Sequence, residues 1–477
     1  MVIFFTIICY FIVLYLLSRY TVKDTNNASF FHAGHNSKWY LVSFGMIGAS
    51  ISGVSFVSVP GMVLSQDMSY IQTCIGFIFG YIIIAFVLLP LYYRLKLISI
   101  YTYLEKRFGI CSYKTGASFF LISKLSGSAV KFYVVCIILQ EFVLNSLGIP
   151  FPVTVICLVL LIWIYSHRGG IKTLVCTDTF QTICMLLALV FIVGEVISAL
   201  NLNLSSAIST IFTDAHSKIF IFDNWKSPHN FWKDFLSGIF IVVVMTGLDQ
   251  DMMQKNLTCK SLRDAQKDMC SYGLAFLPIN FLFLSLGILL SHYLINNGYT
   301  LPEMPDNLML NPIAGGMLGN GVLILFTIGV VAACFSTADS ALTSLTTSFC
   351  IDICNKKHDE KLRKFSHIGI SILFIIFILI FKAFNSNSLI TTVYMIVSYT
   401  YGPLLGLFAY GLFTKRNVND KLVPFICVIS PICCYILDTI ANNLYGYKFG
   451  YDLLMLNGIL TFIGLWISNS IKLKFYQ

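Results

Sequence analysis

The sequence predicts an all-α, polytopic membrane protein with about 13 transmembrane helices. Three observations carry this prediction: the composition, the number of long apolar runs and the placement of the basic residues. Of the 477 residues, 57% are hydrophobic and only 11% are charged, whereas a soluble protein carries about 25% charged residues. The mean hydropathy is +0.81. A soluble core of this size cannot bury so much apolar sequence, but a bilayer solvates the outward faces of helices.

Apolar runs long enough to cross a bilayer recur along the whole chain. A spanning helix needs about 20 predominantly apolar residues. Thirteen runs meet or approach this length: 2–18, 41–63, 70–92, 116–144, 150–166, 173–198, 235–249, 272–294, 313–347, 367–384, 390–413, 422–441 and 452–470. The first run lacks a basic flank and a small-residue cleavage site, so it predicts a retained helix rather than a signal peptide.

The basic residues alternate between the two sides of the predicted membrane. Segments on one side, including the loop that would hold Lys255, contain 24 of the 31 Lys and Arg residues, and the other side holds only Lys218, Lys226, Lys233 and Lys448. Because Lys and Arg accumulate in cytoplasmic loops, the N-terminus is expected outside and the C-terminus in the cytoplasm. The predicted location is a cell membrane, the inner membrane of a bacterium. The net charge of +9 is therefore a topology signal and not a nucleic-acid-binding patch.

The clearest ionisable side chains inside the predicted spans are Lys124, Lys131, Asp178 and Asp339. Such groups are costly in a bilayer and usually face a cavity or a partner. The two lysines are seven residues apart, so they share one helix face. Asp178 lies close to a predicted loop, which leaves open a second interpretation as an interfacial residue that reaches water.

The stretch 336–340 reads Ser-Thr-Ala-Asp-Ser and gathers hydroxyl and carboxylate oxygens in an otherwise apolar helix. Hard cations prefer such oxygen ligands, so the pattern favours a cation site. The alternative is that the hydroxyl groups bond to helix carbonyls or join neighbouring helices.

The predicted span 41–63 is rich in Gly and Ser and ends at Pro60 and Gly61. Small residues at this density weaken a helix. They indicate either close packing against neighbouring helices or a discontinuous helix whose free carbonyl groups bind ions at mid-membrane. The two interpretations are compatible.

Six motifs in order along the chain resemble those of the sodium/solute symporter family, in its bacterial type. They are residues 46–53 with 60–61, the basic loop 94–109, residues 168–181, residues 247–250 with Gln254, residues 336–340 and residues 401–406. The resemblance covers nearly the whole sequence. Members of this family transport proline, sugars, sialic acid, pantothenate and monocarboxylates.

This resemblance implies a five-plus-five inverted-repeat (LeuT-type) transporter fold, in which two five-helix units cross the membrane in opposite senses. The first helix of each repeat lies beside the substrate and the ions. The expected organisation is an extra N-terminal transmembrane helix with a cytoplasmic linker in 1–37, the first repeat in 38–198, an outside loop in 199–234, the second repeat in 235–413, and two C-terminal helices with a short tail in 414–477.

The resemblance also implies which residues bind sodium. A first site takes the carbonyl groups of Gly48, Ile51 and Ala333 and the hydroxyl groups of Ser336 and Thr337. Some members hold a second sodium ion, and the matching residues here are Asp178, Ser336, Asp339 and Ser340. Some of these members have serine at the position of Asp339, so the second site here either binds sodium more tightly or takes a proton.

The implied solute site uses Ser50, Ser52 and Ser55 of the second span, Gln72 and Cys74 of the third span, and Lys131. Lys131 lies where a family member that transports a carboxylate sugar has an arginine facing the substrate. A cation at this position favours an anionic or zwitterionic solute. The alternative is that Lys131 pairs with Glu141 or with Asp178.

The sequence therefore predicts a sodium-coupled secondary active symporter that imports a small polar solute by alternating access, and not an enzyme. Candidate solutes are sialic acid, an amino acid, a monocarboxylate or a sugar. The expected partners are this solute, Na⁺ as the coupling ion and the lipid bilayer, with no cofactor, no other metal and a monomer as the functional unit. The alternatives are a transporter-like membrane sensor and a proton-coupled carrier.

Overall fold

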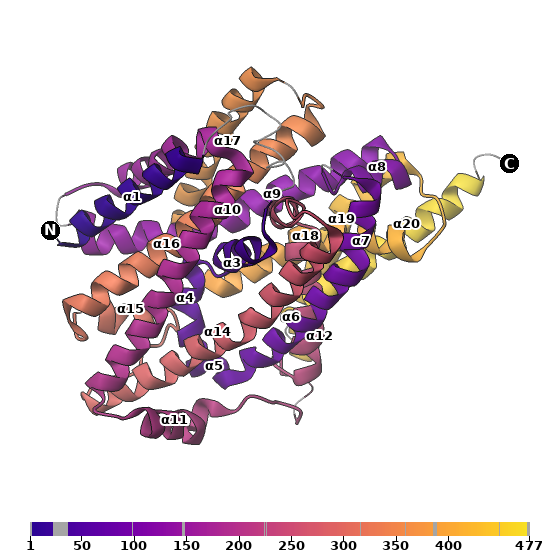
Figure 1. Ribbon diagram of the computed structural model, residues 1–477. Helices are drawn as coiled ribbons and strands as arrows, with labels where there is room; N and C mark the ends of the chain where they lie inside the picture. The colour runs from indigo at the N-terminus through magenta and orange to yellow at the C-terminus, as the bar shows by residue number, and fades with distance from the viewer. Residues whose placement is uncertain are drawn as a thin grey trace.

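The computed structural model describes residues 2–21, 37–97, 99–145, 148–223, 225, 227–314, 316–357, 359–384, 389–447 and 449–474. In these residues every regular element is a helix, and the one β contact is an isolated bridge between Ser37 and Cys259. The all-α prediction is thus confirmed. Figure 1 shows α3 in the middle of the bundle, with α1 and the C-terminal helix α20 on opposite sides.

In the described residues up to position 213, the α-helices are α1 (Val2–Thr21), α3 (Trp39–Ser50), α4 (Gly53–Gly61), α5 (Val63–Gln66), α6 (Tyr70–Ile83), α7 (Leu89–Leu95), α8 (Thr102–Arg107), α9 (Ile110–Leu139), α10 (Phe151–Ala199) and α11 (Leu204–Thr213). They are followed by α12 (Phe231–Val242), α13 (Gln250–Asn256), α14 (Leu262–Asn296), α15 (Asn307–Ala314), α16 (Gly319–Ser348), α17 (Glu360–Phe384), α18 (Leu389–Phe413), α19 (Val423–Tyr445) and α20 (Leu453–Lys474).

Each predicted span coincides with helix, but the exact count of thirteen is not confirmed. Among the described residues, eight helices are long and apolar enough to cross a membrane, or ten if each of two bent helix pairs is one span. The predicted spans 2–18, 150–166 and 452–470 coincide with shorter apolar stretches, Phe5–Tyr20, Phe151–Ser166 and Leu453–Ser468.

The predicted span 235–249 ends too early. The helix continues from α12 through a π-helical turn (Val243–Gly247), breaks at residues 248–249, and resumes as α13 with a bend of 70°. The prediction stopped there because the apolar run stops, whereas the polar residues that follow face other helices instead of water. Lys255 was assigned to a cytoplasmic loop; it lies in α13 and is only 1% exposed.

The bundle buries a polar stretch within its largely hydrophobic core and exposes large apolar side chains on its outside. In α16, which packs against α3, α9 and α10, every residue from 329 to 348 is buried, including the Ser and Thr residues. By contrast, α19 exposes the large apolar side chains of Phe425, Val428, Ile432 and Ile436. Lipid can cover these exposed side chains, so the buried polar stretch of α16 is where the chemistry of the protein is to be sought.

The predicted outside loop 199–234 contains an amphipathic helix that the sequence analysis did not expect. The side chain of Asn203 caps α11 by accepting a hydrogen bond from the backbone N–H of Ser206 at 2.7 Å. Three large side chains at four-residue spacing, Leu204, Ile208 and Phe212, are exposed on it. This spacing puts them on one face, as in helices that lie in a membrane surface.

Gly109 explains part of the basic-loop motif. It has a φ of 144°, and a Cβ atom there would lie 2.4 Å from Asp420 Oδ2. The Asp420 carboxylate accepts hydrogen bonds from the backbone N–H groups of Cys111 and Ser112 at 2.9 and 2.8 Å. A side chain at position 109 would push this carboxylate away, so glycine is needed where the start of α9 meets the start of α19.

Candidate functional site

Two discontinuous helices meet the buried polar stretch of α16. The first is the α3–α4 pair, which is bent by 60°. Its break consists of Ile51 (φ −77°, ψ 94°) and Ser52 (φ −87°, ψ 172°), both in extended conformation. The discontinuous helix predicted from the small residues of span 41–63 is therefore confirmed. The second is the bent pair of α12 and α13 described above.

Close packing, the other interpretation of the same small residues, is also confirmed. A Cβ atom on Gly48 would lie 2.0 Å from Thr182 Oγ1 of α10, and one on Gly53 would lie 2.1 Å from Cys334 Sγ of α16. The two glycines flank the break, so they allow α10 and α16 to approach it from either side.

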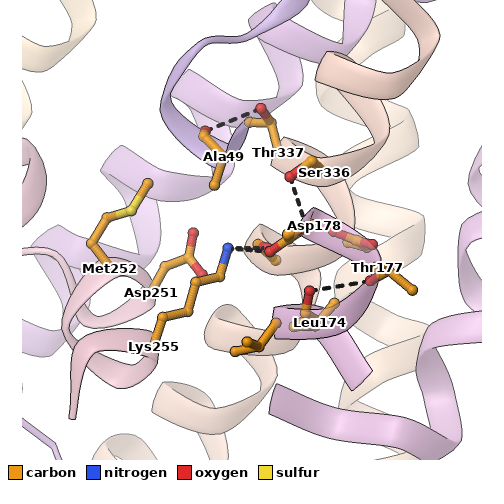
Figure 2. A network of polar contacts seen from close by, with 12 residues as sticks. Ala49, Leu174, Thr177, Asp178, Asp251, Met252, Lys255, Ser336 and Thr337 are labelled. Carbon is orange, nitrogen blue, oxygen red and sulfur yellow. Dashed lines mark hydrogen bonds and ion pairs between the residues drawn. The ribbon is translucent and has the colours of Figure 1, made fainter. Parts of the chain in front are cut away.

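The break frees backbone carbonyl groups at the end of α3. The last C=O groups of a helix have no amide partner within it. The carbonyl of Ile47 still accepts the N–H of Ile51 at 2.9 Å, so the free groups begin at Gly48. Thr337 Oγ1 lies 3.3 Å from the carbonyl oxygen of Ala49 (Figure 2). It also lies 3.0 Å from the carbonyl oxygen of Ala333 in its own helix.

The structure thus places four residues of the predicted first sodium site around one contact between α3 and α16. Gly48 and Ile51 lie within two residues of Ala49, while Ala333 and Thr337 face it from α16. The fifth residue points elsewhere: Ser336 Oγ donates a hydrogen bond to Asp178 Oδ1 at 2.7 Å. Carbonyl and hydroxyl oxygens suit a monovalent cation that must be released again.

Two of the four residues of the predicted second sodium site, Asp178 and Ser340, contact a lysine. Lys255 Nζ lies 2.7 Å from Asp178 Oδ2 and 2.6 Å from Ser340 Oγ. Ser340 Oγ also lies 3.3 Å from Asp178 Oδ2. Figure 2 shows the Lys255 side chain reaching from α13 to Asp178, with Ser336 on the other side of the carboxylate. The interfacial interpretation of Asp178 is wrong, because this residue is fully buried.

Asp339 is hydrogen-bonded to a tyrosine of α10 and not to this lysine. Its Oδ2 atom accepts a hydrogen bond from the hydroxyl group of Tyr165 at 2.8 Å. The group is fully buried. The hydrogen bond from Tyr165 therefore holds the Asp339 side chain against α10.

A cavity of about 110 Å³ lies beside the two breaks. Its lining includes four of the predicted solute-binding residues: Ser50, Ser52, Ser55 and Lys131. Ser50 is hydrogen-bonded to the hydroxyl group of Tyr272, which also lines the cavity. Tyr272 was not predicted, since nothing in its local sequence distinguishes it from a core aromatic residue.

Gln72 and Cys74 are absent from the described residues that line this cavity. Gln72 accepts a hydrogen bond from the backbone N–H of Ile221 at 2.9 Å and donates one to the His229 carbonyl oxygen at 3.2 Å. Its side chain therefore holds the loop 199–234 against α6. Cys74 is fully buried beside it. The position of these two residues outside the cavity lining gives no support to their predicted contact with the solute.

Lys124, the other lysine on the face of Lys131, is neutralised by two carboxylates. Its Nζ atom lies 3.2 Å from Asp249 Oδ2 and 2.7 Å from Asp251 Oδ2, and all three side chains are at most 10% exposed. The hydroxyl group of Tyr401 donates to Asp249 Oδ2 at 2.7 Å. Asp249 and Tyr401 lie in two of the six motifs. Their place in these motifs was the sequence signal for a functional role, although neither residue was predicted to contact Lys124.

Lys131 differs from Lys124 because it remains available to a solute. Its side chain lines the cavity, and among the described residues no carboxylate oxygen lies within 4.0 Å of its Nζ atom. The alternative pairings with Glu141 and Asp178 are not seen in the described part of the chain, where Asp178 pairs with Lys255 instead.

Comparison with known proteins agrees with this architecture. A model of the sodium:solute symporter family matches residues 30–421. The sodium/sialic acid symporter NanT of Aliivibrio fischeri is 24% identical over 473 residues, covering 91% of this chain and 87% of that protein. The sodium/sialic acid symporter SiaT of Proteus mirabilis is 24% identical over 451 residues, covering 88% and 86%.

The predicted fold is confirmed by a solved structure of a Na⁺-coupled sialic acid symporter in a substrate-bound, outward-open state. It matches this chain with a TM-score of 0.83 at 20% identity, covering 99% of this chain and 98% of that one. Because the family model matches most of the sequence, this protein belongs to the sodium:solute symporter family.

Proposed function

We propose that this symporter imports a small anionic or zwitterionic solute together with Na⁺, and that Na⁺ binds where α16 meets the break between α3 and α4. One observation carries the proposal: the hydroxyl group of Thr337 reaches the end of α3 at Ala49 beside a cavity that Lys131 lines. The ion site and the solute site share α3, so occupation of one favours the conformation that the other needs.

The solute class follows from Lys131, since the other two charged residues of the cavity lining, Lys124 and Asp249, pair with each other. Lys131 supplies a positive charge without a carboxylate within ion-pair distance in the described residues, and Ser52 and Ser55 supply hydroxyl groups. A charge-assisted hydrogen bond to a carboxylate is roughly twice as strong as a neutral one. Sialic acid carries a carboxylate and many hydroxyl groups, and two of the relatives transport it, so it is the first solute to test.

The proposed direction of transport is inward. The bias of basic residues supports a C-terminus in the cytoplasm and an N-terminus outside. The proposed location is the inner membrane of a bacterial cell, with a monomer as the transporting unit. One positive charge moving inward across 100 mV contributes about 2.3 kcal/mol. Since about 1.4 kcal/mol corresponds to a factor of ten, one Na⁺ per zwitterionic solute supports a concentration ratio of nearly fifty from the voltage alone. With a monoanionic solute such as sialic acid the two charges cancel, and the Na⁺ concentration gradient alone drives uptake.

A binding screen with a single variant tests the proposal. Sialic acids, amino acids, monocarboxylates and sugars are added to the purified protein in NaCl or in choline chloride, and the unfolding temperature is recorded. We expect stabilisation by one solute class only in NaCl. Thr337→Ala, which removes a hydroxyl ligand, is expected to raise the Na⁺ concentration for half-maximal stabilisation about tenfold.

Thr346→Ala is the matched control. Thr346 is also buried in α16, but its Oγ1 atom donates to the Leu342 carbonyl oxygen of its own helix at 2.6 Å. This variant is expected to leave the Na⁺ dependence unchanged. Solute binding that is equally strong in choline chloride, or that follows pH in place of Na⁺, would refute sodium coupling.

A further inference from the structure

Asp178, Ser336 and Ser340 form a buried group of oxygen atoms contributed by α10 and α16. The Asp178 carboxylate accepts from Ser336 Oγ at 2.7 Å on one oxygen and contacts Ser340 Oγ at 3.3 Å on the other. All three side chains are fully buried. A carboxylate with two hydroxyl groups is an oxygen set that suits a hard cation, and a buried carboxylate requires a positive charge beside it.

The positive charge is already present as part of the chain. Lys255 Nζ contacts Asp178 Oδ2 at 2.7 Å and Ser340 Oγ at 2.6 Å, and its side chain is 1% exposed. Lys255 comes from α13, the second half of the second broken helix, and crosses to α10 and α16 as Figure 2 shows. An ammonium group carries the same charge as Na⁺ and has three hydrogen atoms to donate to these oxygens.

We infer that Lys255 is a built-in cation that takes the place of a second sodium ion. Because the ammonium group is covalently tethered, it satisfies Asp178 in every cycle without being transported. The inference rests on the proposed function and deepens it: the coupling ratio is one Na⁺ per solute. Asp178 then joins α10, α13 and α16 and is not a ligand of a transported ion.

The contact at Thr337 differs from the one at Asp178 because no cation of the chain takes part in it. Its two partners are carbonyl oxygens of Ala49 and Ala333, and neither brings a positive charge. A cation can therefore enter at Thr337 and leave again, whereas the position beside Asp178 is filled by the lysine. The charge at position 255 thus sets how many ions the protein binds.

The test counts ions on the full-length protein in lipid nanodiscs, using equilibrium binding of radioactive sodium. The wild type is expected to bind one Na⁺. Lys255→Met keeps the length of the side chain but removes the charge, so it is expected to bind two. The Hill coefficient for Na⁺ is expected to rise from about 1 toward about 2. The binding assays of the variant are run in high NaCl, because Na⁺ then replaces the missing ammonium group and supports the fold.

Two further variants separate charge from structure. Lys255→Arg keeps the positive charge and is expected to bind one Na⁺. The double variant Lys255→Met with Asp178→Asn removes both charges, so it should fold without Na⁺ at this position and bind one ion. Thr337→Ala should weaken the one site of the wild type and only one of the two sites of Lys255→Met.

The number of sodium ions bound by each variant decides between the two roles of Lys255. Two sodium ions on the wild type would overturn the role of Lys255 while leaving sodium coupling intact. One ion on a folded Lys255→Met protein would also overturn it. If the single variant does not fold but the double variant does and binds one ion, the charge of Lys255 is what Asp178 requires, as inferred. No sodium on the wild type would instead remove the proposed function itself.

Discussion

Lys124→Met is expected to destabilise the folded protein by about 3–5 kcal/mol, which is the usual cost of removing one partner from a buried ion pair. Lys124 is the cation for two carboxylates, Asp249 and Asp251, at 3.2 and 2.7 Å. Without it both carboxylates stay in the low-dielectric interior, where an unpaired charge is costly. Resistance of the purified protein to denaturing detergent measures the loss.

Uptake is expected to fall together with stability in Lys124→Met. Lys124 connects α9 to the break of the second discontinuous helix, because Asp249 also accepts the backbone N–H of Asp251 at 2.9 Å and thereby caps α13. Adding Asp251→Asn to Lys124→Met removes one of the two unpaired charges, so this double variant should recover part of the lost stability.

An exposed lysine near the start of α9 provides the control for Lys124→Met. Lys114 of α9 is exposed, and its Nζ atom donates to the Ile353 carbonyl oxygen at 3.2 Å. Lys114→Met is expected to change stability by less than about 0.5 kcal/mol. Equal effects of the two substitutions, or wild-type stability of Lys124→Met, would show that the ion pairs do not hold the second break.

Lys131→Gln is expected to raise the solute concentration for half-maximal uptake by about 10- to 100-fold. A hydrogen bond to a charged group contributes about 1.5–3 kcal/mol, and about 1.4 kcal/mol is a factor of ten. The substitution removes the positive charge but keeps a polar group of similar length. Because Lys131 has no carboxylate within 4.0 Å among the described residues, little stability should be lost.

The charge of the solute distinguishes this role from a structural one. Lys131→Gln should weaken the binding of sialic acid far more than that of a neutral sugar, and Lys131→Arg should retain the preference for an anion. The Na⁺ concentration for half-maximal uptake should stay close to the wild-type value at saturating solute. A variant with unchanged affinity for the anion would remove Lys131 from the solute site.

The sequence predicted those parts of the site that depend on local patterns. The small residues of span 41–63 indicated a break, which the structure shows at Ile51 and Ser52. The hydroxyl groups of 336–340 indicated an oxygen-rich surface, and α16 buries all of them. In both cases residues of one helix carry the signal, so sequence spacing alone is sufficient to find it.

The parts that were missed depend on which helices meet. Lys255 was counted as a loop residue because polar residues surround it in the sequence. Its own side chain reaches α10 and α16, while Asp251 and Asn256 contact α9 and α14. The partners of Lys124 lie about 125 positions further along the chain, and nothing local connects them. Gln72 was assigned to the solute from the resemblance to the family, whereas its side chain contacts the loop 199–234.

The most direct test of the account is uptake into proteoliposomes of the solute that the binding screen identifies. An inward Na⁺ gradient is applied, and the same gradient of choline serves as the reference. The account predicts accumulation above the external concentration only with the Na⁺ gradient, and a strong reduction in Thr337→Ala at low Na⁺. Equal uptake with choline, or accumulation that Thr337→Ala leaves unchanged at every Na⁺ concentration, would contradict it.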